Sequence, residues 1–244
     1  MSGASDWSTG VSAGGVPWVG NFAGGFEGEE AKAAGRWVVC VHGFGTGKGG
    51  SKITRIMTEL RGRGVGAIAI DLAGHGENGR ELTIENCVED IAGAVEMLQG
   101  KLNERGERRP IGLYGSSFGG FCVLCYLCNR READMGRVML VAPAVCMAKN
   151  FEPYENKMKN GIFITPKLVE SVRRYDVLGS ARRLRGLDIV YGENDTAVDN
   201  GDIFELFKRA KWCNLYKIEG AEHWFAGKGE LDQIVDIAMH AFAD

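Results

Sequence analysis

The chain has 244 residues, 45% of them hydrophobic, which is enough for one α/β domain over residues 1–244 with a substantial core. A net charge of −3 and a pI near 5.9 give no electrostatic basis for binding nucleic acid or an anionic membrane. The first 20 residues contain no lysine or arginine, and the longest apolar run, residues 138–148, is too short to span a bilayer. We therefore expect a cytoplasmic protein without a signal peptide or a membrane segment.

Residues 1–35 are rich in glycine and weakly patterned. We expect a loose tail over residues 1–15, followed by one or two edge strands around Trp18 and residues 22–26. From residue 37 onward, apolar runs of strand length alternate with helical patterns. These runs cover residues 37–41, 65–72, 111–114, 137–142, 187–191 and 215–218.

Helical patterns lie between most of these runs. Thr83 is a candidate N-cap for a helix in which apolar residues recur at helical spacing from Ile84 to Leu102. The strand runs are continuously apolar rather than alternating in polarity, which is typical of a parallel sheet covered on both faces. The predicted fold class is therefore α/β, with a doubly wound, mostly parallel sheet.

One stretch breaks the alternation, because residues 143–185 separate two strands by more than a simple crossover needs. We expect this insert to form a small cap at the carboxyl edge of the sheet. Its apolar side chains are candidates for lining a substrate pocket, and the alternative is that they pack the insert onto the sheet edge. The candidate pocket residues are Phe151, Tyr154, Met158 and Phe163, together with Trp224 in a later loop.

Arginines cluster in the last part of the insert, and two interpretations are open. We expect a solvated helix face, whereas the alternative is a basic rim that prefers acidic substrates. The cluster comprises Arg173, Arg174, Arg182, Arg183 and Arg185.

Seven cysteines, an odd number, lie mostly in apolar stretches, as reduced core thiols do. Cys122, Cys125 and Cys128 are three residues apart, but this spacing drifts around the face of a helix and no histidine is nearby. We expect neither a metal site nor a cofactor.

Gly115-Ser116-Ser117-Phe118-Gly119 fits G-x-S-x-G, in which a serine lies on a tight turn between a strand and a helix. An apolar strand precedes it and an apolar helix follows. The turn predicts a strained backbone at Ser117 and places its hydroxyl at the carboxyl edge of the sheet, beside a helix N-terminus that favours negative charge. Ser117 is therefore the candidate nucleophile.

A serine hydroxyl needs an adjacent base, and the base needs an acid that orients it. His223 lies in a loop between the last strand and the last helix, where a base is needed, whereas His240 lies late in the final helix. The acid is expected after the strand at 187–191, where Asp195 is our choice and Asp199 the alternative. A nucleophile, an acid and a base in this chain order predict a catalytic triad.

Acyl transfer also needs hydrogen-bond donors for the developing oxyanion. The stretch Val-His-Gly-Phe-Gly at residues 41–45 follows the first clear strand. We expect the backbone N–H groups of Phe44 and Phe118 to form the oxyanion hole. His42 and His75 are expected to hold loops by hydrogen bonds.

The glycine-rich stretch at residues 43–51 also resembles a phosphate-binding loop, because it follows a strand and contains a lysine. It departs from that pattern in two places. Three residues rather than four separate Gly43 from Gly47, and Gly49 stands where the pattern has a serine or threonine for Mg²⁺. A nucleotide site is therefore disfavoured.

Together the motifs resemble the α/β-hydrolase family from about residue 36 to the C-terminus. Within that family, the short insert is similar to that of cinnamoyl/feruloyl esterase-like and serine-aminopeptidase-like hydrolases. Many members carry a histidine where this chain has Ser116, and the N-terminal strands are shorter here. The resemblance rests on His42-Gly43-Phe44-Gly45, Asp71-Leu72-Ala73-Gly74-His75-Gly76, the stretch from Gly115 to Gly120, Gly192-Glu193-Asn194-Asp195 and Gly220-Ala221-Glu222-His223.

The motifs and the resemblance predict a serine hydrolase that cleaves a carboxylic ester of a small or aromatic acid through an acyl-enzyme. The expected partner is a small-molecule ester, and no cofactor, metal, nucleic acid or membrane is required. A peptidase or thioesterase with the same triad is the alternative among enzymes. A relative that binds a ligand without catalysis is a further alternative, which a complete triad disfavours.

Overall fold

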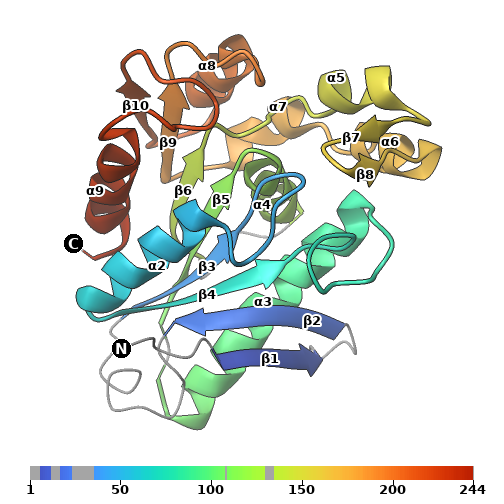
Figure 1. Cartoon of the computed structure of the whole chain (residues 1–244). Coiled ribbons are helices and arrows are strands. Elements are labelled where there is room, and N and C mark those ends of the chain that lie inside the picture. The colour runs from blue at the N-terminus through green and yellow to red at the C-terminus, as the bar shows by residue number, and fades with distance from the viewer. Residues whose placement is uncertain (1–5, 12–16, 24–35, 108, 130–134, 244) are drawn as a thin grey trace.

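Figure 1 shows the computed structural model, which describes residues 6–11, 17–23, 36–107, 109–129 and 135–243. They form an eight-stranded sheet in the order β1-β2-β4-β3-β5-β6-β9-β10. The neighbours from β4 to β10 are parallel, whereas β1 pairs with β2 and β2 with β4 in antiparallel fashion. The strands are β1 (Asp6–Val11), β2 (Pro17–Ala23), β3 (Arg36–Val41), β4 (Val65–Asp71), β5 (Ile111–Ser116), β6 (Met135–Val141), β9 (Leu187–Gly192) and β10 (Asn214–Ile218).

Helices cover both faces of this sheet, with α2 packed against α9 on one face and α3 packed against α4 on the other (Figure 1). Thr83 caps α3, because its side-chain oxygen accepts a hydrogen bond from the Asn86 N–H at 3.2 Å. The predicted doubly wound, mostly parallel α/β fold is therefore confirmed. The longer helices are α2 (Ser51–Gly62), α3 (Ile84–Glu104), α4 (Phe118–Cys128), α8 (Asn200–Arg209) and α9 (Glu230–Phe242).

The central strands form the floor of the core. Every residue of β4 and β5 is buried, and so is every residue of β3 except Arg36. Continuous burial follows from the continuous apolar runs, because helices on both faces cover both sets of side chains. The six predicted strand runs correspond to β3, β4, β5, β6, β9 and β10.

The prediction for the N-terminal residues is partly wrong. Residues 6–11 form β1, which pairs with β2 along its whole length, so this part of the expected loose tail over residues 1–15 is a strand. Backbone pairing defines these strands, and a glycine-rich sequence has few side chains whose pattern would indicate a strand. β2 contains Trp18, as expected, and residues 1–5, 12–16 and 24–26 lie outside the described residues.

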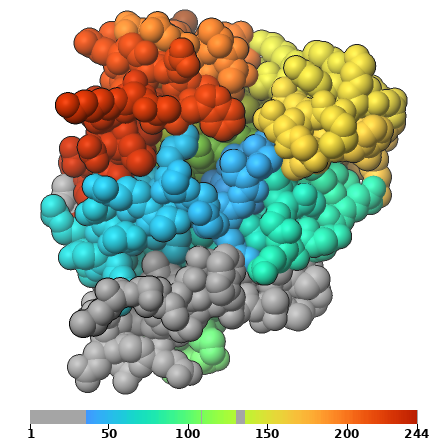
Figure 2. Space-filling model, viewed as in Figure 1, coloured from blue at the N-terminus to red at the C-terminus, as the bar shows by residue number. Residues whose placement is uncertain are grey.

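The insert between β6 and β9 consists of short elements that lie at the carboxyl edge of the sheet (Figure 1). In the space-filling view of Figure 2, the surface is hollowed between the insert, in yellow, and the C-terminal segments, in orange and red. Thr165 caps the helix that begins at Pro166, since its Oγ1 accepts a hydrogen bond from the Leu168 N–H at 3.1 Å. The elements are α5 (Ala148–Phe151), η1 (Glu152–Tyr154), β7 (Met158–Lys159), β8 (Ile162–Phe163), α6 (Pro166–Arg173), α7 (Val177–Ser180) and η2 (Ala181–Arg183).

Acidic partners accompany the arginines at the end of α6. Arg173 lies 2.8 Å from Glu152, and Arg174 lies 2.6 Å from Glu170 and 3.3 Å from Glu85. These exposed pairs favour a solvated helix face over a basic rim, because the neighbouring carboxylates offset the positive charge.

Among the described residues, no helix combines the length and the apolar character needed to cross a bilayer. All seven cysteines lie in the described part of the chain, and each is a free thiol. Cys122 and Cys125 are buried in α4, where burial raises the pKa of both thiols. They are therefore inert core side chains rather than nucleophiles.

Candidate active site

Ser117 occupies the turn between β5, which ends at Ser116, and α4, which begins at Phe118. Its φ of 53° and ψ of −115° form a conformation rarely adopted by a residue with a Cβ, as the motif predicts. The Ser117 N–H donates to the Val141 carbonyl of β6 at 2.9 Å, which anchors the turn. The residue thus lies at the carboxyl edge of the sheet and at the N-terminus of α4, where negative charge is favoured.

Glycines beside Ser117 allow the strand and the helix to approach closely. A Cβ on Gly119 would lie 2.3 Å from the His42 carbonyl oxygen, and one on Gly115 would lie 2.9 Å from the Gly119 carbonyl oxygen. Any larger side chain would force the turn open at these positions. At Gly43 a Cβ would lie 3.6 Å from the Ser117 Cβ, so the loop after β3 reaches the nucleophile.

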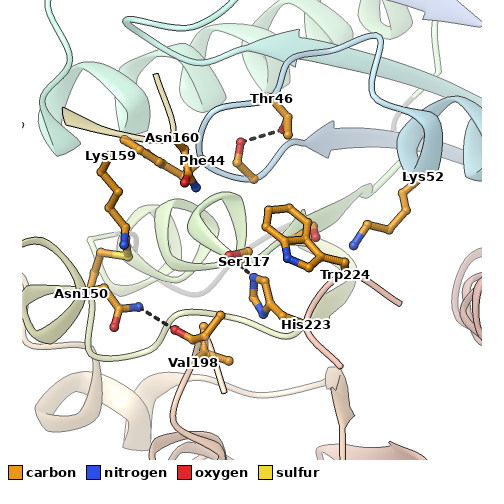
Figure 3. Close-up of a pocket in the computed structure, with 14 residues that line it drawn as sticks. Phe44, Thr46, Lys52, Ser117, Asn150, Lys159, Asn160, Val198, His223 and Trp224 are labelled. Atoms are coloured by element: carbon orange, nitrogen blue, oxygen red, sulfur yellow. Dashed lines mark hydrogen bonds between the residues drawn. The ribbon is translucent and has the colours of Figure 1, made fainter. Parts of the chain in front are cut away.

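The structure brings Ser117, His223 and Asp195 together from three separate loops. The Ser117 hydroxyl donates to Nε2 of His223 at 2.9 Å (Figure 3), and Nδ1–H of His223 donates to Oδ2 of Asp195 at 2.7 Å. Asp195 follows β9 and His223 follows β10, so the parallel strands deliver all three residues to one edge of the sheet. This is the geometry that a nucleophile, a base and an orienting acid require.

Asp195 is held by its own loop as well as by His223. Its Oδ1 accepts hydrogen bonds from the N–H groups of Ala197 at 2.8 Å and Val198 at 3.1 Å. Burial acts to raise the pKa of Asp195, but the hydrogen bond and charge interaction with His223, together with the backbone bonds, outweigh it and hold the pKa below its usual value. The carboxylate therefore stays ionised and can fix the His223 tautomer that carries its proton on Nδ1.

Asp199, the alternative acid, has a different role. Its carboxylate accepts from the Gly201 N–H at 2.8 Å as the N-cap of α8, and the Lys149 ammonium lies 3.5 Å away. His240 lies exposed in the last turn of α9. The structure thus places Asp195 and His223, rather than these two residues, beside the serine.

Phe44 and Phe118 flank Ser117 from two sides. Phe44 belongs to the loop after β3 and lines the cavity beside the serine (Figure 3). Phe118 is the first residue of α4. Their rings pack edge to face with centroids 5.6 Å apart, which fixes the two backbones relative to each other. The first N–H groups of a helix have no partner within it, so that of Phe118 is suited to donate to an oxyanion. The oxyanion hole stays a prediction.

A buried histidine holds the loop after β3. His42 Nδ1–H donates to the Gly43 carbonyl at 2.8 Å, and its Nε2 accepts from the Leu72 N–H at 3.0 Å. Burial and the neighbouring His75 lower the pKa of His42 to about 4. The ring is therefore neutral at physiological pH and acts as the expected structural tie between two loops.

Lys48, the lysine of the stretch that resembles a phosphate loop, is 2% exposed. Its ammonium lies 2.8 Å from Asp71 and 2.5 Å from Glu77, and its backbone N–H donates to Asp71 at 2.8 Å. These contacts tie the loop to the end of β4 and occupy the ammonium. They give a further reason to disfavour a phosphate site here.

A cavity of about 130 Å³ opens beside Ser117 and His223 (Figure 3). Its walls come from the loop after β3, the start of α2, the insert, and the loops after β9 and β10. Of the five predicted pocket residues, Trp224 lines it. The lining residues are Gly43, Phe44, Thr46, Lys52, Ser116, Ser117, Met147, Asn150, Lys159, Asn160, Ala197, Val198, His223 and Trp224.

The other four predicted pocket residues do not line this cavity. Phe151 is fully buried and packs among aromatic rings beneath it. Met158 and Phe163 are paired in the β7–β8 hairpin, so the alternation of side chains puts them on the face opposite Lys159. Tyr154 is exposed, and its ring lies 4.0 Å from the Lys159 ammonium.

Several polar residues of the cavity were not predicted from the sequence. The prediction chose apolar side chains of the insert as pocket residues, whereas the polar residues Asn150, Lys159 and Asn160 between them line the cavity. The sequence does contain one signal for the hairpin, because Asn160-Gly161 is a typical two-residue hairpin turn. In the structure both residues have the positive φ that such a turn requires, 47° and 79°. A hairpin around this turn would have put the side chains of Lys159 and Met158 on opposite faces.

The chain matches the family described as serine aminopeptidase, S33, over residues 32–174. This match spans more than half of the chain, and the chain belongs to that family of α/β-hydrolases. A comparison with curated proteins found no match.

Solved structures agree on the fold. Est1E from Butyrivibrio proteoclasticus superposes with a TM-score of 0.77 over 96% of each chain at 17% identity. The same protein with ferulic acid bound gives a TM-score of 0.78 at 18% identity, over 94% of this chain and 96% of that one. A cold-adapted esterase from an Arctic intertidal metagenomic library gives 0.68 at 21% identity, over 97% and 93% of the two chains. At these identities the similarity establishes the α/β-hydrolase fold.

Proposed function

We propose that the protein is a serine hydrolase that cleaves carboxylic esters of small or aromatic acids. The observation that carries the proposal is the hydrogen-bonded chain from Ser117 through His223 to Asp195 beside an open cavity. The family membership and the fold shared with esterases support hydrolysis. The cavity of about 130 Å³ directly beside Ser117 suits a small or aromatic acyl group.

In this mechanism the Ser117 oxygen attacks the carbonyl carbon of the ester while Nε2 of His223 takes the hydroxyl proton. The backbone N–H groups of Phe44 and Phe118 stabilise the oxyanion. His223 then gives the proton to the leaving alcohol, and the acyl group stays on Ser117. Water then attacks the acyl carbon while Nε2 of His223 takes a proton from it, and His223 gives this proton to the Ser117 oxygen as the bond to the acyl group breaks and the acid leaves. Asp195 stabilises the imidazolium in both halves of the reaction.

The proposal is tested by labelling the protein with a fluorophosphonate probe and measuring hydrolysis of short aryl esters. We expect Ser117→Ala to abolish both, with the fold retained in circular dichroism. Ser116→Ala is the matched control, because Ser116 is the preceding residue at the end of β5, and this variant should keep the label. Labelling that survives in Ser117→Ala would move the nucleophile elsewhere.

A peptidase is the second candidate, because the matched family is described as a serine aminopeptidase. An aminopeptidase needs an anionic group to receive the α-ammonium of its substrate. The cavity lining contains two lysines and no aspartate or glutamate among the described residues, which favours an ester over an N-terminal peptide. Aminoacyl p-nitroanilides compared with matched p-nitrophenyl esters distinguish the two, and faster cleavage of the anilides would favour the peptidase.

We also propose a reducing, cytoplasmic location. The support is that each of the seven cysteines is a free thiol. Determination of the thiol content of the native protein isolated without reductant tests this, and disulfide-linked cysteines would contradict it.

A further inference from the structure

Lys52 lies next to the proposed catalytic site. It is the second residue of α2, and Figure 3 shows its side chain reaching toward the cavity beside Trp224. Its ammonium lies 5.2 Å from the centre of the Phe225 ring. Within the described part of the chain it forms no hydrogen bond or ion pair. Lys48, four residues earlier, has both.

Burial makes this ammonium sensitive to a nearby anion. Loss of water lowers the pKa of Lys52, and the charge of Asp195 offsets part of this effect. The Asp195 carboxylate is already hydrogen-bonded to His223 and to two backbone N–H groups. An anionic group of a ligand would therefore give Lys52 the hydrogen-bonded partner that the described residues do not supply.

A second and larger cavity meets the first at Lys52. It has a volume of about 560 Å³, and the two cavities share Lys52, Thr46 and Trp224 among their lining residues. Beyond Lys52 its walls are mainly apolar, with Ile53, Phe225 and Leu231 among them. A ligand that extends from Ser117 into this cavity passes the lysine.

Of lysines and carboxylates, only lysines line the two cavities among the described residues. Among the described residues, Lys52 and Lys159 line the first cavity, Lys52 lines the second, and no aspartate or glutamate lines either. The first turn of α2 carries no acidic residue and has no side-chain cap, so its positive end is not neutralised locally. Both features favour a ligand with a negative charge.

We propose that the substrate is an ester that carries a carboxylate, and that Lys52 binds this carboxylate in the larger cavity while the ester carbonyl lies at Ser117. The inference rests on the proposed esterase function and names its substrate class. A single lysine among apolar walls matches a singly charged carboxylate on a hydrocarbon part. Lys52 is then a specificity-determining residue, and Lys159 on the opposite wall is not required for the preference.

The test compares esters that differ only in the charged group. For the acyl half, p-nitrophenyl hydrogen adipate is compared with p-nitrophenyl hexanoate. For the alcohol half, 3-acetoxybenzoate is compared with its methyl ester. We expect kcat/KM to favour the anionic member of one pair by on the order of 10- to 100-fold, the range of a charge-assisted hydrogen bond. The pair that responds identifies which half of the ester carries the carboxylate.

Substitutions test whether Lys52 causes the preference for the anionic ester. Lys52→Gln should remove the preference, Lys52→Arg should retain most of it, and Lys159→Gln should leave it in place. Lys101→Gln is the matched control, because Lys101 is a half-exposed lysine of α3 outside both cavities. Using the ratio of two esters cancels any effect of Lys52 on the triad itself. Higher ionic strength should reduce the ratio in the wild type.

The outcomes separate the two proposals. Equal kcat/KM within both pairs, or a preference that survives in Lys52→Gln, would overturn the carboxylate site. The proposed esterase function would still hold in that case if Ser117 is labelled and neutral esters are cleaved. If no ester is cleaved and Ser117 is not labelled, the proposed function fails and the carboxylate site fails with it. A preference lost only in Lys159→Gln would overturn the assignment to Lys52.

Discussion

The reactivity that we propose for Ser117 depends on its backbone more than on its side chain. A φ of 53° costs free energy for a residue with a Cβ, and the fold maintains it through the hydrogen bond to Val141 and the close approach of Gly119 to β3. Ser116, one residue earlier, lies in β5 with ordinary strand geometry. The turn thus distinguishes two chemically identical side chains.

At the same scale, Asp195→Asn should lower kcat by up to about 10⁴-fold while the protein stays folded. An asparagine can occupy the same space, but its amide does not stabilise the imidazolium and can present an N–H to His223, which favours the wrong tautomer. Steady-state hydrolysis of an aryl ester measures this effect.

The matched control for that prediction is Asp199→Asn. Asparagine caps helices as well as aspartate does, so the cap of α8 is kept and only the surface charge beside Lys149 changes. We expect kcat close to the wild type. A larger loss in Asp199→Asn than in Asp195→Asn would make Asp199 the orienting acid.

At the scale of the elements, two phenylalanines of the insert differ in burial. Phe151, at the end of α5, is fully buried, with its ring centre 5.0 Å from that of Phe44 and 5.8 Å from that of Phe118. Phe163, in β8, is 50% exposed. The buried residue thus joins the insert to the two residues proposed for the oxyanion hole.

This arrangement predicts that Phe151→Ala lowers the free energy of unfolding by about 3–5 kcal/mol, because it removes a ring and leaves a cavity in packed surroundings. Phe163→Ala should change it by less than about 1 kcal/mol, since a half-exposed ring loses little burial. Chemical denaturation of both variants measures the difference. Equal effects of the two substitutions would show that Phe151 does not anchor the insert.

The sequence predicts some elements better than others for physical reasons. The buried strands and the G-x-S-x-G turn depend on local residues, since continuous apolar runs and glycines at fixed offsets leave few other conformations. The face on which each side chain of the β7–β8 hairpin lies depends on the alternation along its strands, and the prediction that Met158 and Phe163 line the pocket assigns these two side chains to the wrong face. β1 depends on pairing with β2, which its own residues do not encode.

Over the whole molecule, the candidate site is formed by ends of parallel strands. The loops after β3, β5, β9 and β10 all contribute to it, so the sheet brings together residues more than a hundred positions apart in the chain, such as Ser117 and His223. The order of these loops is predictable from the alternation of strands and helices in the sequence and from the order of the motifs. The positions of Lys52 and Asn150 are not, because they follow from how α2 and the insert pack across the sheet edge.

The stability of the whole molecule should depend on pH through the buried His42. In the folded protein its Nε2 accepts from the Leu72 N–H, so protonation would break that bond as well as bury a charge. Burial, followed by the charge of the neighbouring His75, lowers its pKa from 6.5 to about 4. Burial also lowers the pKa of the adjacent His75, which adds to the effect in the same direction.

Between these two pKa values the unfolded chain binds a proton that the folded chain does not, so the free energy of unfolding rises with pH in this window. The contribution of His42 is fully present above pH 6.5 and is lost as the pH falls to about 4, and it amounts to roughly 3 kcal/mol. His42→Gln should flatten this part of the profile, because the glutamine oxygen can accept from the Leu72 N–H without titrating. Urea denaturation from pH 4 to 7 measures it, with the exposed His240→Gln as control, and identical slopes for the wild type and His42→Gln would contradict the assignment.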